Sequence, residues 1–163
     1  MEHQRKNILG ISPGTRYTGF AVIKDMSLID WRMKTFKGKW STLKLRMIEA
    51  TIKRHIEKYA INVIALKVPH PARSSRELEL IIKVVKKVTN DCKIGYYPYC
   101  WEDIKSYCPS ENRYTKNVLI DFVLNKYPEV RHVYQREKQN RWAYYIKIFE
   151  AIALAHFLRN EVL

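Results

Sequence analysis

The N-terminal part of the chain constrains the fold most, because three short stretches of β type follow one another with only brief interruptions. Residues 8–11 form an apolar run that Pro13 and Gly14 end, and residues 17–24 and 27–36 have the composition and partial alternation of strands. Asp25 and Met26 stand where a hairpin turn is expected. The chain is therefore predicted to open with a three-stranded antiparallel meander.

Helical and strand-like segments alternate after this meander. In order, we predict a helix from the N-cap Ser41 to about Tyr59, a strand at 62–67, a loop through Pro69 and Pro71, a helix beginning at Ser75, a strand at 93–97 ended by Pro98, and helices at 101–107, 115–126 and 142–160. This order predicts an α/β fold of the ribonuclease H-like type. Its five-stranded mixed sheet, three strands antiparallel and two parallel, would be flanked by helices in a single domain over residues 1–163.

The charge balance favours a polyanionic partner. Lysine and arginine outnumber the acids 30 to 16, which gives a formal charge of +14. A phosphate backbone gains most from such a field, through counterion release, although a basic surface that only maintains solubility is the alternative. The sequence shows no secretory signal or membrane span, and Cys92, Cys100 and Cys108 lack CxxC spacing. We therefore expect reduced thiols and a cytoplasmic location.

Four segments resemble motifs of the RuvC-type Holliday-junction resolvases. Residues 8–23 (ILGISPGTRYTGFAVI) resemble the first motif, in which a strand ends in an acid and Pro-Gly-Thr leads to a strand that begins Thr-Gly. Residues 64–67 (IALK), 114–118 (YTKNV) and 150–155 (EAIALA) resemble later motifs in the same order. The first and last matches are the specific ones. The resemblance implies a ribonuclease H-like fold, DNA as the partner and a homodimer.

The resemblance also locates the family's catalytic site, where four acidic positions hold Mg²⁺ or Mn²⁺ for strand cleavage. These metal-site positions are occupied here by Ser12, Lys67, Lys147 and Glu150. Only one carboxylate remains, and the two ammonium groups would repel a divalent cation. We therefore expect neither a bound metal nor cleavage by the family mechanism. Asp30 or Asp103 as substitute ligands would be the alternative.

Cations and a histidine outside these positions are candidate DNA contacts. His70 falls where the family carries an aromatic residue that contacts DNA, and Arg73 follows in the same loop. The other candidates for phosphate contacts are Arg16, Arg76, Arg113 and Lys116. A solvated loop residue is the alternative role for His70, and solvated charges are the alternative for the cations. The aromatic residues Tyr134, Trp142, Tyr144 and Tyr145 are predicted to pack in the interior.

Three functions remain open from the sequence. The first is a RuvC-like protein that binds branched DNA with a degenerate nuclease site. The second is an active, divergent nuclease with other metal ligands. The third is a structural or regulatory domain that kept the fold and lost nucleic-acid binding.

Overall fold

The computed structural model describes residues 5–108, 115–137 and 145–162. A mixed sheet of five strands forms its centre: β1 (Asn7–Ser12), β2 (Tyr17–Lys24), β3 (Ser27–Thr35), β4 (Val63–Lys67) and β5 (Gly95–Tyr99), in the spatial order β3-β2-β1-β4-β5. The pairs β1–β2 and β2–β3 are antiparallel, and β1–β4 and β4–β5 are parallel. The predicted ribonuclease H-like sheet is thus confirmed.

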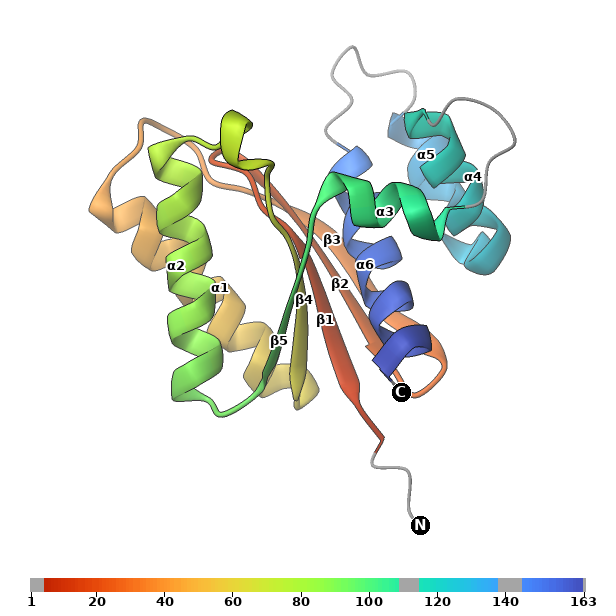
Figure 1. Cartoon of the computed structure of the whole chain (residues 1–163), viewed down its shortest axis with the longest axis horizontal. Coiled ribbons are helices and arrows are strands. Elements are labelled where there is room, and N and C mark those ends of the chain that lie inside the picture. Colours follow the sequence, from red (N-terminus) through yellow and green to blue (C-terminus); the bar gives the residue numbers. More distant parts are fainter. Residues whose placement is uncertain (1–4, 109–114, 138–144, 163) are drawn as a thin grey trace.

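Helices cover both faces of the sheet (Figure 1). One face carries α1 (Thr42–Tyr59) and α2 (Arg76–Asp91). The other carries α6 (Ile146–Val162), with α3 (Trp101–Tyr107), α4 (Lys116–Lys126) and α5 (Arg131–Glu137) around it. Two hydrophobic cores result, and β1 and β4 between them consist almost entirely of buried residues. None of the described helices is long and apolar enough to cross a membrane.

The helices on the first face begin where the sequence predicts. The Ser41 hydroxyl accepts a hydrogen bond from the Lys44 amide at 3.1 Å, and the Ser75 hydroxyl accepts one from the Leu78 amide at 3.1 Å. Each bond satisfies an amide that the first helical turn leaves without a partner. The predicted face of α1, including Ile48 and Ile52, is buried in the core.

Three predicted boundaries differ from the structure. Strand β5 continues through Pro98, which pairs with Leu66, because an edge strand needs no outward amide at that position. Helix α5 and a 3-10 turn (Pro128–Val130) form in a region for which no element was predicted. The last helix begins at Ile146 rather than at 142, and residues 142–144 lie outside the described part of the chain.

Two glycines allow α6 to lie directly on the central strands. A Cβ atom at Gly10 would lie 2.0 Å from the Ala151 carbonyl oxygen, and one at Gly19 would lie 2.1 Å from the Lys147 carbonyl oxygen. No side chain fits in either space, so the start of α6 is held against β1 and β2. This close approach determines where the first turns of α6 place their side chains.

Candidate nucleic-acid-binding site

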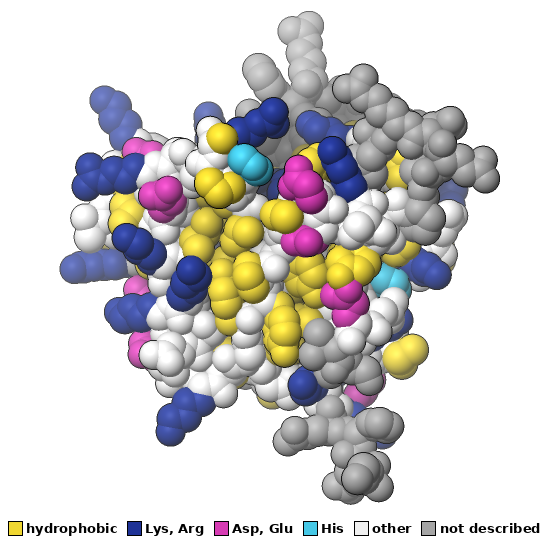
Figure 2. All heavy atoms as spheres, viewed as in Figure 1, with side chains coloured by type: hydrophobic (Ala, Val, Ile, Leu, Met, Phe, Trp, Pro, Cys, Tyr) yellow, Lys and Arg dark blue, Asp and Glu magenta, His cyan; other side chains and the backbone are white. Residues whose placement is uncertain are grey.

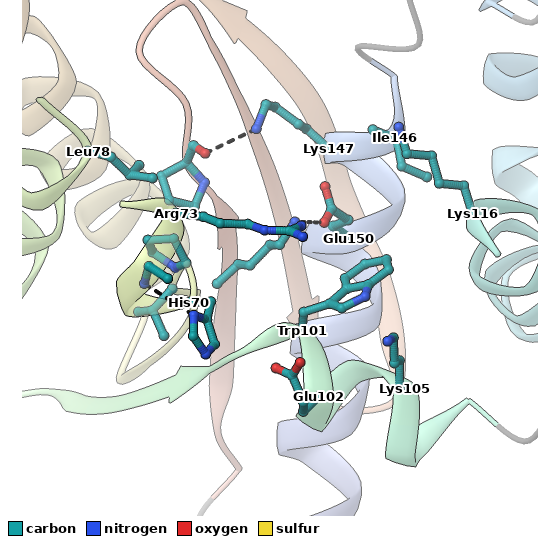
Figure 3. Close-up of a pocket in the computed structure, with 15 residues that line it drawn as sticks. His70, Arg73, Leu78, Trp101, Glu102, Lys105, Lys116, Ile146, Lys147 and Glu150 are labelled. Carbon is teal, nitrogen blue, oxygen red and sulfur yellow. Dashed lines mark hydrogen bonds and ion pairs between the residues drawn. The ribbon is translucent and has the colours of Figure 1, made fainter. Parts of the chain in front are cut away.

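The four metal-site positions lie together at one end of the sheet. Ser12 is the last residue of β1 and Lys67 the last residue of β4, and these parallel strands end side by side. Figure 3 shows Lys147 and Glu150 projecting from the first turns of α6 into the same region. Residues three apart on a helix share a face, so both side chains point towards the strand ends.

Glu150 is the centre of this cluster. This residue is only 3% exposed. Its carboxylate forms an ion pair with the Lys67 ammonium, which donates a hydrogen bond to it, and accepts a second hydrogen bond from the Ser12 hydroxyl at 3.3 Å. A buried carboxylate without a partner would be costly, so the ammonium of Lys67 provides the charge compensation that the carboxylate needs. Three of the four positions thus form one internal network.

Lys147 is held separately, against the loop between β1 and β2. Its ammonium donates a hydrogen bond to the Pro13 carbonyl oxygen at 3.1 Å. Burial lowers the pKa of Lys147 below its ordinary value, the Glu150 carboxylate acts in the opposite direction, and the Lys67 and Lys116 ammonium groups lower it further. A Cβ atom at Gly14 would lie 2.9 Å from Cε of this lysine, so the Pro-Gly turn leaves space for its chain.

The cluster forms one wall of a pocket of about 860 Å³, here called the site pocket. Its charged and aromatic lining residues are Lys67, His70, Arg73, Trp101, Glu102, Lys105, Lys116, Lys147 and Glu150. Among the described lining residues, five lysine and arginine side chains oppose two carboxylates, which gives a formal charge of +3 with histidine neutral. An anionic ligand is therefore favoured over a cationic one.

Three of the predicted DNA contacts, His70, Arg73 and Lys116, line the site pocket. His70 also has a structural role, because its Nδ1 accepts the Ala72 amide at 3.1 Å and caps a short 3-10 turn (Pro71–Arg73). The exposed Arg73 lies at the end of that turn.

Of the other three predicted cations, Arg16 and Arg76 are described and do not line the pocket. The Arg16 guanidinium lies 5.6 Å from the centre of the Tyr17 ring, and the exposed Arg76 is the first residue of α2. Arg113 lies outside the described residues, as do Trp142 and Tyr144.

The two other aromatic residues predicted to pack do so. The Tyr134 and Tyr145 rings meet edge to face at 6.2 Å, and both contact the Phe149 ring.

The sequence prediction missed the contribution of α3 to the pocket. Trp101, Glu102 and Lys105 come from this helix, which follows directly after β5. The Lys67 and Lys105 ammonium groups lie 5.4 and 5.8 Å from the centre of the Trp101 ring. The available signal was topological, because β5 is parallel to β4 and ends beside Lys67.

The residues of the pocket do not fit a pair of divalent cations. Mg²⁺ and Mn²⁺ require clustered oxygen ligands, whereas Glu150 is already bound by an ammonium group. Within residues 5–108, 115–137 and 145–162, no group of three or more His, Cys, Asp or Glu side chains could hold a metal ion.

The alternative acids, Asp30 and Asp103, do not line this pocket. Asp30 is bonded to Arg32 and Tyr59 on the far side of the sheet, and Asp103 accepts the Cys100 amide.

Comparison with solved structures places this geometry in a known fold. No protein-family model matches the chain, and no curated protein matches it in sequence. RuvC of T. thermophilus in complex with Holliday junction substrate is similar with a TM-score of 0.72 at 13% sequence identity, over 92% of this chain and 90% of that one. A second Thermus thermophilus RuvC structure gives a TM-score of 0.67 at 14% identity, over 94% and 95%. The chain therefore has the RuvC-like form of the ribonuclease H-like fold along nearly its whole length.

Proposed function

We propose that this protein binds branched DNA, such as a four-way junction, and leaves the DNA strands intact. The observation that carries the proposal is the Lys67–Glu150 ion pair within a pocket of net positive charge, at positions that the family resemblance assigns to the metal site. The pair occupies the one described carboxylate that could bind a metal there, and the other lining cations attract phosphate. The pocket thus favours binding and opposes cleavage.

The charge of the protein supports DNA as the ligand. A chain with a formal charge of +14 releases many counterions when it contacts a phosphate backbone, and the site pocket concentrates five cations on its lining. Lys105 and Lys116 reach the pocket from α3 and α4, opposite Arg73. Cations from several elements suit a backbone that runs across the pocket.

The choice of branched DNA rests on the fold comparison. The RuvC structure with a TM-score of 0.72 was solved with a Holliday junction substrate. We extend this ligand class to the present chain because the site pocket here lies at the metal-site positions taken from the family motif.

Electrostatic repulsion supports the absence of cleavage. The charge of Lys67 is offset by Glu150, whereas Lys147 forms no ion pair with a described residue. A divalent cation about 4 Å from such an ammonium group would be repelled by about 8 kcal/mol at an effective dielectric constant of about 20. Lys67 and Lys147 both line the pocket, and Glu150 is its one carboxylate at a metal-site position. The proposal therefore assigns the pocket a phosphate-binding role without metal chemistry.

The proposed homodimer and cytoplasmic location stay predictions. Figure 2 shows apolar side chains gathered over α2 and β5 in the centre of one face, with charged side chains of both signs around them. Such a patch supports self-association. Sedimentation at micromolar concentrations measures the oligomeric state directly.

The test of the proposal uses a labelled four-way junction with Mn²⁺, analysed on native and denaturing gels from the same samples. We expect a shifted band with intact strands. Strand cleavage that a chelator abolishes would instead identify a divergent nuclease. No shift at low salt would leave a structural or regulatory domain.

A matched pair of variants tests whether the site pocket holds the DNA. The pocket variant Lys105→Gln/Lys116→Gln removes two lining cations, and Lys83→Gln/Lys93→Gln removes two exposed cations elsewhere. We expect the pocket variant to reduce the salt dependence of binding by about two phosphate contacts and the control to change it little. Equal effects of both variants would contradict a localised site.

A further inference from the structure

A second cluster of cations lies away from the site pocket, where β3 meets α1. We call this cavity of about 90 Å³ the β3–α1 groove; its lining residues are Asp30, Arg32, Lys34, Thr51, Arg54, His55, Lys58 and Tyr59. Four cations oppose one carboxylate, so its formal charge is +3 when His55 is neutral. Burial lowers the pKa of His55, which favours the neutral ring.

The groove arises from two separate sequence patterns: polar residues alternate along β3, and polar residues recur at helical spacing along α1. Asp30, Arg32 and Lys34 alternate along β3 and therefore share one face of the sheet. Val22 and Phe20, the pairing partners of Asp30 and Arg32, belong to the core beneath α1, so that face is the one α1 covers. The α1 residues of the groove are 51, 54, 55, 58 and 59, a spacing that also defines a single helical face. Polar residues thus face each other where a helix and a sheet usually bury apolar ones.

The one carboxylate of the groove is already used. Asp30 accepts a hydrogen bond from the Tyr59 hydroxyl at 2.7 Å and forms an ion pair with Arg32 at 3.0 Å. These bonds orient Arg32 and leave no acid for the other cations. Among the described residues, Lys34, Arg54 and Lys58 have no carboxylate within ion-pair distance.

The floor of the groove is a buried histidine. His55 is 7% exposed, and its ring stacks on the Phe20 ring at a centroid distance of 4.6 Å. Its Nδ1 lies 2.9 Å from the Thr51 carbonyl oxygen, so this nitrogen carries the proton in the neutral ring. Cations mounted on such a floor repel one another unless an anion joins them.

We propose that the β3–α1 groove binds an oxyanion, namely a backbone phosphate of the bound DNA outside the site pocket. Its volume corresponds to about three water molecules, which suits one phosphate group. Three strand spacings of about 4.8 Å separate β3 from β4, so the groove is about 14 Å along the sheet from the strand that carries Lys67. A DNA arm that leaves the pocket spans this distance within one helical turn.

The assignment of the groove to a DNA phosphate rests on the proposed function. One experiment tests the groove and the proposed function separately. Junction affinity is measured over a range of salt for the wild type, the pocket variant, the groove variant Arg54→Gln/Lys58→Gln and the control Lys83→Gln/Lys93→Gln. Arg54 and Lys58 are exposed and do not line the site pocket, so their replacement leaves that site unchanged. We expect the groove variant to weaken binding on the order of tenfold and to lower the salt slope by about 1, the value for one lost phosphate contact, with little effect of the control.

Each other outcome identifies what fails. If the groove variant binds like the control while the pocket variant binds weakly, the groove does not bind a DNA phosphate, and the proposed function stays in place. A wild type that binds no junction at low salt overturns both. Inorganic phosphate, followed by NMR shifts of the groove residues, distinguishes the source of the anion. Phosphate binding without any effect of the groove variant on DNA affinity would assign the groove to free phosphate and overturn the DNA assignment.

Discussion

The Lys67→Met substitution tests the ion pair at the centre of the site pocket. It removes the ammonium group from the carboxylate of Glu150, a residue that is 3% exposed. Among the described residues, the Ser12 hydroxyl at 3.3 Å is then the remaining hydrogen-bond partner of that carboxylate. Breaking a fully buried pair costs about 3–5 kcal/mol. The Lys67 side chain is 27% exposed, and water partly compensates the loss. We therefore expect the free energy of unfolding to fall by about 3 kcal/mol.

Urea denaturation followed by circular dichroism measures this loss. With a slope of about 2 kcal/mol per molar urea, the midpoint should fall by about 1.5 M. The double variant Lys67→Met/Glu150→Leu removes both charges and should recover most of the loss, because a well-packed apolar pair replaces an ion pair at little net cost. Lys83→Met is the surface control, with an expected change below about 0.5 kcal/mol.

One result would refute this reasoning. If Lys67→Met unfolds within about 0.5 kcal/mol of the wild type and the double-mutant cycle gives no coupling, the ammonium extends into solvent instead of neutralising Glu150. The pocket would then be an open basic surface, and the argument that an internal cation replaces the metals would fail.

Three further predictions concern the fold and the metal-site positions. Burial lowers the pKa of His156 to about 4, so the unfolded chain takes up its proton first as the pH falls. The contribution of His156 to the free energy of unfolding is therefore fully present above about pH 6.5 and is lost as the pH falls towards 4. In the wild type, urea denaturation should show this loss between pH 7 and about 4.5, and His156→Gln should make the loss smaller by about 2–3 kcal/mol. Gly19→Ala should cost at least about 3 kcal/mol in the same assay, whereas Gly38→Ala, in open space at φ +88°, should cost about 1 kcal/mol. The variant Ser12→Asp/Lys67→Glu/Lys147→Asp restores four carboxylates and should bind Mn²⁺ in calorimetry; a folded variant that binds none would contradict the assignment of the metal-site positions.

The sheet and the proximity of Ser12, Lys67, Lys147 and Glu150 were predictable because local patterns determine them. The alternation in residues 17–24 and 27–36 and the Pro13–Gly14 turn predict the meander, and hydrophobic run lengths predict the later strands. Parallel strands end at the same edge, so once β1 and β4 are neighbours, Ser12 and Lys67 must lie close together. The helical spacing of Lys147 and Glu150 places both on one face of α6.

The pairing within the site and the β3–α1 groove could not be predicted in the same way. Whether Lys67 bonds Glu150 or extends into solvent depends on the depth at which α6 packs, which Gly10 and Gly19 control through contacts more than a hundred residues away in sequence. The groove requires the register of β3 on β2 and the rotation of α1 about its axis. The sequence contains both periods, but no local signal indicates that they face each other.

The Lys67–Glu150 ion pair also determines whether the site needs divalent cations in order to form. The close packing of α6 on β1 brings the Glu150 carboxylate into the interior, where a cation must neutralise it. In a site of four carboxylates, metal ions would supply that charge; here Lys67 supplies it from within the chain. The pocket should therefore be fully formed, and bind DNA, without divalent cations. Junction affinity in a chelator should equal that in Mg²⁺ at matched ionic strength, within about twofold, because the remaining effect of Mg²⁺ is competition for phosphates. A requirement for Mg²⁺ in binding would show that a metal, and not Lys67, completes the site.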